Sequence, residues 1–437
     1  MRRILSGFKA FFYEENRFLS PRPINGILLL GFLTVAPLCA SKILIPMDLT
    51  QTDHLKAYGV AYHTLQKGQN VEWLLNYRSG SFMTDYDPKV ETECGVEGVR
   101  WEIIKPNEVL DIYRTIEENN MEAVLLEKAP KIAVYIPENF EPWDDAVTLA
   151  LEYADIPYEQ VWDEDVLKGK LDKYDWLHLH HEDFTGQYGK FYGSYRNADW
   201  YKQEVKTNET MAKTLGYNKV SKMKLAVALV IRDYVKKGGF IFSMCSACDT
   251  YDIGLAALNT DICHEIFDGD PFDGAANKKL DFSQSLAFEN YQVVLDPLVY
   301  EHSTIDVGLE AQARGPNTYF SLFDFSAKFD PVPCMLVQNH TALVKEFLGQ
   351  CSGFRRTLIK PSVVVLADVS GTEEAKYLHG NYDKGTFTYL AGHDPEDYQH
   401  FVGDPPTDLK NLKNSPGYRL ILDNVLFPAA RKKELKT

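Results

Sequence analysis

The chain has 437 residues, of which 45% are hydrophobic and 13% aromatic. It is long enough to bury a sizeable core and to form two or three folding units. The formal net charge is -16 at pH 7, and the sequence lacks the basic stripe that a nucleic-acid partner would need, so that class of function is excluded.

The first 40 residues are typical of a secretory signal peptide. Basic residues precede an apolar run from Ile24 to Leu38, and the small residues Cys39, Ala40 and Ser41 follow. The apolar core is about a dozen residues, shorter than the roughly 20 that span a bilayer, which favours cleavage near Ala40 over an anchor. Lipidation at Cys39 is the alternative, although Leu38 stands where lipoprotein signals carry a small residue. We expect an exported chain, in the periplasm or at the cell surface, with no transmembrane anchor after cleavage.

Seven cysteines occur in the sequence, and six remain when Cys39 is removed with the targeting segment. An oxidising compartment allows disulfides, but the spacing shows no dense framework. Cys245 and Cys248 form a C-x-x-C pair at a predicted helix start, so a redox pair is one interpretation. The six cysteines are Cys94, Cys245, Cys248, Cys263, Cys334 and Cys351.

The mature chain opens with a β-α-β pattern, which we expect to form an N-terminal unit over residues 41–127. Residues 81–100 contain turn residues, and their apolar residues show no sustained helical or strand periodicity, so this segment is predicted to be a polar connector. The predicted elements are a strand at 42–46, a helix at 54–66, a strand at 71–76 and a helix at 107–118.

The main domain is predicted over residues 128–430 and has the α/β class of fold. Strands that alternate with helices imply a mostly parallel sheet with helices on both faces. The predicted strands lie at 131–137, 159–162, 176–180 and 240–244, and the helices at 142–153, 221–237 and 249–258.

A β-rich insertion is expected at about residues 270–345, because 319–325 and 334–337 resemble strands and no long helix follows at once. The pattern then closes with three more strands, the last two joined by a hairpin turn at 381–385, and with a terminal helix opened by Ser415. These closing elements are predicted at 362–366, 375–379, 386–390 and 416–427.

Cys245 is the first candidate for chemistry. It follows a short apolar strand and precedes a helix, and the small residues Ser243 and Ala247 flank it at a distance of two. A nucleophile at a sharp strand-to-helix turn needs such neighbours. The alternative is a buried core cysteine, which is common.

A cluster of ligand-type side chains lies at the carboxyl end of the strand predicted at 176–180. His178, His180, His181 and Glu182 stand close together, and open α/β sheets build their sites at this edge. His178 and His180 alternate to one face of the strand, so a divalent metal held by imidazoles and a carboxylate is geometrically feasible. The alternative is that these histidines order the following loop.

The second cluster follows the strand predicted at 386–390. A histidine at a strand end with carboxylates close by supplies what a cysteine nucleophile needs, a proton acceptor and a group that orients it. Cys245, His393 and either Glu396 or Asp394 therefore form a candidate triad. The alternative is a turn in which Asp394 caps the next segment.

Residues 384–394 (KGTFTYLAGHD) and 418–427 (YRLILDNVLF) resemble the closing strand, histidine turn and last helix of the trehalose-utilisation (ThuA-like) proteins. These belong to the class I glutamine amidotransferase-like superfamily. The resemblance covers roughly residues 130–430 and implies a flavodoxin-like core, with Cys245 as nucleophile, His393 as base and Glu396 or Asp394 as acid. Amidotransferases of the superfamily carry the acid two residues after the histidine, where this sequence has Pro395.

The whole chain also resembles exported proteins of the Bacteroidetes that are often called asparagine synthetase B. A synthetase of that kind needs an N-terminal cysteine nucleophile and a pyrophosphate loop for ATP, and the sequence has neither.

Two functions remain open. The first is an exported hydrolase of amidase or carbohydrate-processing type that uses Cys245 or a metal ion. The second is a non-catalytic protein that binds a small molecule or a carbohydrate through an aromatic loop. That loop contains Tyr188, Phe191, Tyr192, Tyr195, Trp200 and Tyr201.

Overall fold

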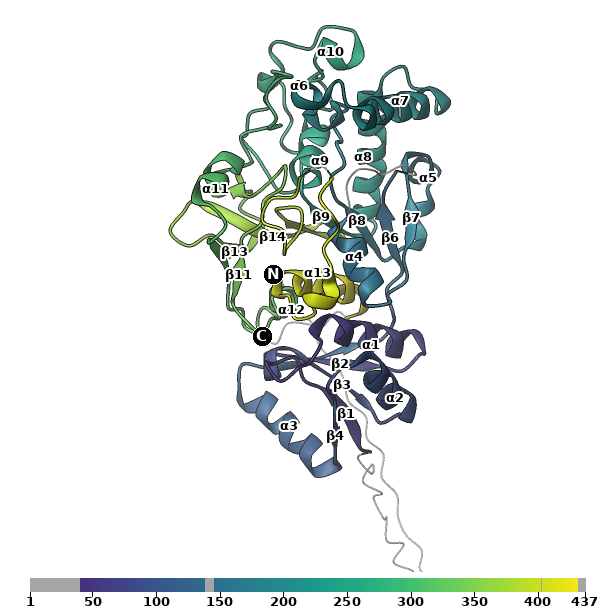
Figure 1. Ribbon diagram of the computed structural model, residues 1–437, viewed down its shortest axis with the longest axis vertical. Coiled ribbons are helices and arrows are strands. Elements are labelled where there is room, and N and C mark those ends of the chain that lie inside the picture. The colour runs from purple at the N-terminus through teal and green to yellow at the C-terminus, as the bar shows by residue number, and fades with distance from the viewer. Residues whose placement is uncertain (1–39, 138–144, 402, 431–437) are drawn as a thin grey trace, which may run out of the picture. The chain divides into compact units, whose positions relative to one another are not determined.

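The computed structural model describes residues 40–137, 145–401 and 403–430, and Figure 1 shows the course of the chain. The predicted signal peptide, residues 1–40, lies outside these ranges except for its last residue. None of the helices in the described ranges combines the length and apolar character that a membrane span requires. From Ala40 onward the chain forms one compact unit.

The first sheet has five strands in the order β4-β1-β3-β2-β5, and all neighbours are antiparallel. Since β3 lies between them, β1 and β2 run in the same direction, which is a split β-α-β arrangement. The elements are β1 (Lys42–Ile45), α1 (His54–Gln66), β2 (Val71–Leu75), β3 (Ser81–Asp85), α2 (Pro88–Glu97), β4 (Glu102–Ile104), α3 (Pro106–Glu118) and β5 (Glu122–Leu126).

The connector predicted over residues 81–100 is wrong, because β3 and α2 occupy it. Asp87 caps the start of α2 with its side chain, and only Val90 and Cys94 of that helix are buried. A helix with so few buried positions shows little apolar periodicity in its sequence. β3 is recognised only through its pairing with β1 and β2.

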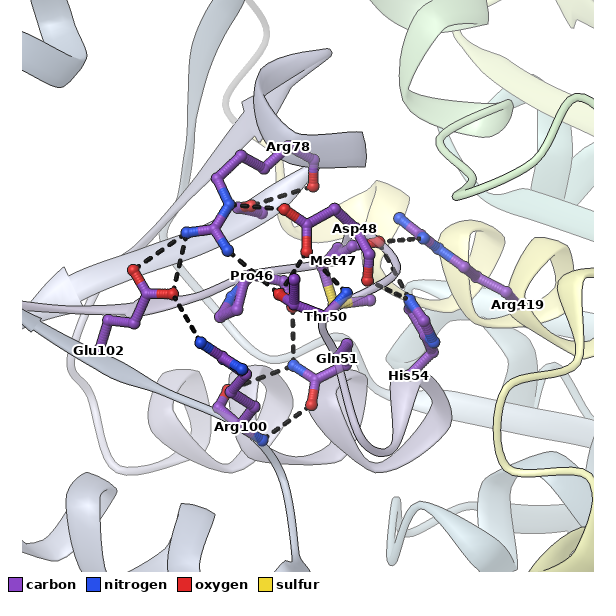
Figure 2. Close-up of polar contacts among 11 residues, drawn as sticks. Pro46, Met47, Asp48, Thr50, Gln51, His54, Arg78, Arg100, Glu102 and Arg419 are labelled. Carbon is purple, nitrogen blue, oxygen red and sulfur yellow. Dashed lines mark hydrogen bonds and ion pairs between the residues drawn. The ribbon is translucent and has the colours of Figure 1, made fainter.

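A buried arginine links the first sheet to the terminal helix α13 (Pro416–Leu426). Arg419 is fully buried, and its guanidinium donates to the hydroxyl of Tyr58 at 3.0 Å and to the carbonyl oxygens of Met47, at 2.9 Å, and Ser79. Figure 2 shows Arg419 beside Met47 and near His54, the first residue of α1. A buried charge is tolerated when its donors are satisfied in this way.

The second sheet has ten strands, in the order β11-β10-β13-β14-β15-β9-β8-β6-β7, with β12 paired to β14. The strands β7, β6, β8, β9 and β15 are parallel to one another, and the remaining pairs are antiparallel. The fold is therefore α/β with a mixed sheet, and the prediction of a mostly parallel sheet holds for one half of it.

The parallel strands are β6 (Ile132–Tyr135), β7 (Glu159–Val161), β8 (Trp176–Leu179), β9 (Phe240–Met244) and β15 (Gly385–Leu390). The antiparallel part contains β10 (Tyr319–Leu322), β11 (Leu343–Lys345), β12 (Phe354–Arg355), β13 (Val364–Asp368) and β14 (Glu374–Tyr382). The helices before residue 245 are α4 (Ala146–Tyr153), α5 (Asp163–Leu167), α6 (Tyr192–Tyr195), α7 (Asp199–Thr214) and α8 (Val220–Lys236). Those after it, besides α13, are α9 (Ala247–Ala256), α10 (Glu265–Asp268), α11 (Gly308–Arg314) and α12 (Pro331–Leu336).

Helices cover both faces of the parallel half, as predicted. Along β9, Phe240, Phe242 and Met244 join the core that contains residues of α4 and α13. Ile241, between them, joins the core that contains residues of α8 and α9. This alternation follows from the two-residue period of a strand.

The strand predicted at 334–337 is wrong, because these residues fall in and just after α12. Pro331 at the first turn fixes a φ suited to a helix, and the apolar run Cys334, Met335 and Leu336 is buried. A short apolar run does not distinguish a strand from a buried helical turn. The predictions of the terminal helix and of its Ser415 cap are confirmed.

Candidate functional site

Cys245 lies in the sharp turn between β9 and α9, as predicted. Its φ of 49° is in the left-handed region, which side chains with a Cβ rarely adopt. Its N–H donates to the carbonyl oxygen of Gly392 at 3.1 Å, and the N–H of Gln350 donates to its Sγ at 3.3 Å. Burial raises the pKa of the thiol to about 11, and the N–H groups of Gln350, Ser246 and Cys351 oppose that rise.

One cavity of about 320 Å³ brings Cys245 together with His181 and His393. The three residues follow β9, β8 and β15, which are adjacent parallel strands. Their carboxyl ends meet at the same edge, where open α/β sheets bind ligands. The structure therefore gathers the thiol and two of the predicted histidines in one place.

His178 and His180 contact a carboxylate that the sequence analysis did not single out. Asp145, the cap of α4, lies 3.3 Å from Nε2 of His178 and 3.4 Å from Nδ1 of His180. Although burial favours the protonated acid, the two imidazoles hold the pKa of Asp145 well below its usual range. Its place after β6, at the carboxyl end of a parallel strand, is the signal that would have identified it.

Acceptor groups around His178 and His180 decide the tautomer of His180. Nδ1 of His178 lies 2.9 Å from the carbonyl oxygen of Phe242, which only accepts, so this nitrogen carries a proton. The ionised carboxylate of Asp145 only accepts, so Nδ1 of His180, which lies 3.4 Å from it and 3.1 Å from Nε2 of His178, carries a proton as well. Nε2 of His180 is then left as an acceptor, and it has no hydrogen-bond partner among the described residues.

His180, His181 and His393 form a compact imidazole cluster. One nitrogen from each ring lies within 4.8 Å of the other two, and the centroids of the His180 and His393 rings are 4.6 Å apart. Burial and the neighbouring imidazoles hold the pKa of His393 well below its usual range. Neutral imidazole is the form that binds metal ions, so this cluster is able to hold one.

Glu182 lies apart from this cluster, in a buried group that includes Lys224 and Asp163. Burial raises the pKa of Glu182 to about 8, and Lys224 opposes the rise. Lys224 is itself paired with Asp163 at 3.0 Å. Of the four predicted ligands, the structure thus places His180 and His181 in the cluster, His178 behind it and Glu182 elsewhere.

Asp394 and Glu396 anchor the loop that follows β15. The carboxylate of Asp394 accepts hydrogen bonds from the hydroxyls of Thr407 at 2.6 Å and Tyr418 at 2.9 Å. Burial raises the pKa of Glu396, and a hydrogen bond with Ser415 opposes the rise. These contacts tie the loop to α13, so both carboxylates have a structural task. That one of them orients His393 stays a prediction.

Some aromatic side chains of the predicted binding loop pack in a hydrophobic core, and others line the cavity. Tyr188 and Tyr201 are buried in a small core of their own. Phe191 and Tyr195 line the cavity, together with Tyr300 and Phe401 from distant segments.

No protein-family model and no curated protein matches the chain. Among solved structures, two cytoplasmic proteins of Salmonella typhimurium are similar over 69% of this chain and 100% of theirs, with 12% and 13% identity and TM-scores of 0.34 and 0.35. A GH42 β-galactosidase is similar over 66% of this chain and 31% of its own, with 10% identity and a TM-score of 0.24. With TM-scores below 0.5, these similarities add nothing to the functional argument.

Proposed function

We propose that the chain is a metal-assisted hydrolase whose divalent cation is bound by His180, His181 and His393. The observation that carries the proposal is Nε2 of His180, a buried acceptor without a hydrogen-bond partner among the described residues. An unpaired buried nitrogen costs free energy unless something fills the position. A cation shared with the other two rings supplies that partner.

Asp145 supports this assignment from behind the cluster. Histidines that bind metal commonly donate their second N–H to a carboxylate, which fixes the tautomer and raises the basicity of the ligating nitrogen. Nδ1 of His180 is 3.4 Å from a carboxylate oxygen of Asp145 and 3.1 Å from His178. The ring is therefore held with Nε2 toward the proposed ion.

Three imidazole ligands favour Zn²⁺, and three protein ligands leave a fourth position open, as in catalytic zinc sites. When bound, such an ion lowers the pKa of a water molecule to about 7 and polarises an acyl or phosphoryl oxygen. The backbone N–H of Gln350 donates to Sγ of Cys245 in this structure. During turnover, the same N–H would be available to stabilise an oxyanion that forms next to Cys245.

Metal analysis of the full mature chain, purified without chelators, tests the proposal. We expect about one equivalent of Zn²⁺, its loss in His180→Ala, and visible absorption from a tetrahedral site after exchange with Co²⁺. His379→Ala is the matched control, because His379 is also buried and also has an unpaired Nε2, but it belongs to none of the possible ligand groups among the described residues. Metal-dependent turnover is then sought with a panel of chromogenic esters, amides and glycosides. A wild-type chain that binds no Zn²⁺ or Co²⁺ at equimolar concentration contradicts the proposal.

A second candidate is a hydrolase in which Cys245 is the nucleophile and His393 the base, as the ThuA-like resemblance implies. The left-handed φ of Cys245 at the β9–α9 turn favours it. The two routes give opposite results: a chelator abolishes turnover only in the metal route, and Cys245→Ala abolishes it only in the thiol route while metal binding is retained. If no substrate of the panel is turned over but ligands bind, the chain is a binding protein on this scaffold.

We also infer a flavodoxin-like core and an exported chain. The parallel strands β6, β7, β8, β9 and β15, numbered one to five along the chain, lie in the order 2-1-3-4-5, which is the order of that fold. Export rests on the sequence of residues 1–40 alone. N-terminal sequencing of the chain secreted by its host tests it, with cleavage near Ala40 expected.

A further inference from the structure

We propose that the cavity beside Cys245 binds a small ligand with an ammonium group and rejects anionic ligands. The proposal concerns the ligand of the site described under the proposed function, but it does not require the metal ion or turnover. It rests on the aromatic and acidic side chains that line the cavity besides the histidines, here called the wall.

Aromatic rings form much of that wall. Phe191, Tyr195 and Tyr300 all line the cavity, and the ring of Phe191 lies 6.0 Å from Tyr195 and 5.9 Å from Tyr300 between centroids. Phe401 lines the same cavity and is 57% exposed, and Tyr300 is 43% exposed. Aromatic faces carry negative electrostatic potential, so they attract a cation within about 6 Å of the ring centroid.

The charged side chains of the lining have the same sign. Glu301 and Asp306 line the cavity, and none of the described lining residues is a lysine or an arginine. Burial raises the pKa of Asp306 to about 7, and the backbone N–H of Ser352, 2.8 Å from its carboxyl group, opposes the rise. Glu301, the sequence neighbour of Tyr300, is therefore the main anion of the lining. The net charge of -16 adds long-range attraction for cations.

Two buried lysines lie behind the wall, and both have their ammonium groups engaged. Nζ of Lys190 donates to the carbonyl oxygens of Val294 and Glu301 at 2.8 and 2.9 Å. Nζ of Lys376 donates to the carbonyl oxygen of Ser352 at 2.7 Å. Neither side chain lines the cavity, so in the metal-free chain the lining offers no cationic side chain to a phosphate or carboxylate.

The test compares choline with 3,3-dimethylbutan-1-ol, which has the same shape without the charge, by calorimetric titration of the metal-free mature chain at constant ionic strength. We expect choline to bind at least tenfold more tightly than the alcohol. We expect inorganic phosphate to show no saturable binding to the metal-free chain. Equal affinity for the two isosteres, or saturable phosphate binding, would overturn the proposal.

Two variants locate the binding. Tyr300→Leu and Glu301→Gln are each expected to weaken choline binding about tenfold, and the isosteric Glu301→Gln keeps the test valid if Tyr300→Leu lowers stability. Tyr319→Leu is the control, because Tyr319 on β10 is 46% exposed, like Tyr300, but does not line the cavity. Unchanged choline affinity in both cavity variants would place the binding elsewhere. Failure of the proposed function would appear separately, as a wild-type chain without bound metal.

Discussion

The carboxylate of Asp145 lies within 3.4 Å of ring nitrogens of both His178 and His180, and all three side chains are buried. Asp145 is the N-cap of α4, and the histidines lie at the end of β8, so the contact joins the start of α4 to the carboxyl end of β8. Removing the charge of such a partner typically lowers metal affinity 10- to 100-fold.

Asp145→Asn is therefore expected to weaken Zn²⁺ binding by about this factor without unfolding the chain, because asparagine still accepts hydrogen bonds from the start of α4. Competition with a chromogenic chelator measures the affinity. Asp87→Asn, at the equivalent capping position of α2, is the control for a cap far from the cluster. Equal affinity in the Asp145 variant and the wild type would argue against a role for Asp145 behind the metal.

Two glycines inside helices are expected to respond to alanine in opposite directions. A Cβ on Gly59, in α1, would lie 2.2 Å from the carbonyl oxygen of Ala154, whereas one on Gly95, in α2, would meet nothing closer than 3.6 Å. Gly95→Ala should stabilise the chain by about 0.5–1 kcal/mol through helix propensity. Gly59→Ala should destabilise it by about 1–3 kcal/mol, since the backbone of Ala154 must move. Chemical denaturation of the two variants checks the contrast in sign.

Arg419→Met is expected to destabilise the chain by about 3–5 kcal/mol. The change would leave the carbonyl oxygens of Met47 and Ser79 without their donor and would remove the charge beside buried Asp423. Arg114→Met is the control, because Arg114 is two-thirds exposed and its pair with Asp111 should contribute under about 1 kcal/mol. Faster hydrogen exchange in α1 would show that the loss acts where Arg419 meets the first sheet.

The stacked pair His54 and His340 should make stability fall in acid. Their ring centroids are 4.2 Å apart, and burial, the other imidazole and Arg419 lower the pKa of His340 from 6.5 to about 3. The unfolded chain therefore binds this proton at a higher pH than the folded chain does. The contribution is complete above pH 6.5 and is lost as the pH falls from there toward 3.

Urea denaturation at several pH values between 7 and 4 measures this loss. His340→Gln should show a shallower fall over that range than the wild type. His63→Gln provides a contrast of opposite sign, because the hydrogen bond with Glu93 raises the pKa of His63, so its contribution is lost as the pH rises. Parallel pH profiles for the wild type and His340→Gln would contradict the assignment.

Local sequence patterns were sufficient to predict elements that have a capping or turn residue at one end and a regular spacing of apolar residues. The helix after Ser415 has a cap, a proline at its first turn and a buried apolar face, and the hairpin between β14 and β15 has Asp383 with a positive φ in its turn. Such signals act over a few residues, so sequence alone locates them. α2 and α12 were missed because α2 buries only two residues and α12 spans only Pro331–Leu336.

The sequence by itself determined the α/β class, the turn that presents Cys245 and the presence of ligand-type histidines after two strands, because each depends on neighbours along the chain. Only the tertiary structure decided which histidines meet. His180 and His181 lie more than two hundred residues from His393, and they come together because β8, β9 and β15 are adjacent in the sheet. The same order of strands brings Asp145 behind His180 and leaves Glu182 beside Lys224. Strand order depends on packing between residues that are far apart in the sequence. The local spacing of apolar residues identifies a single strand or helix but does not say which strands become neighbours.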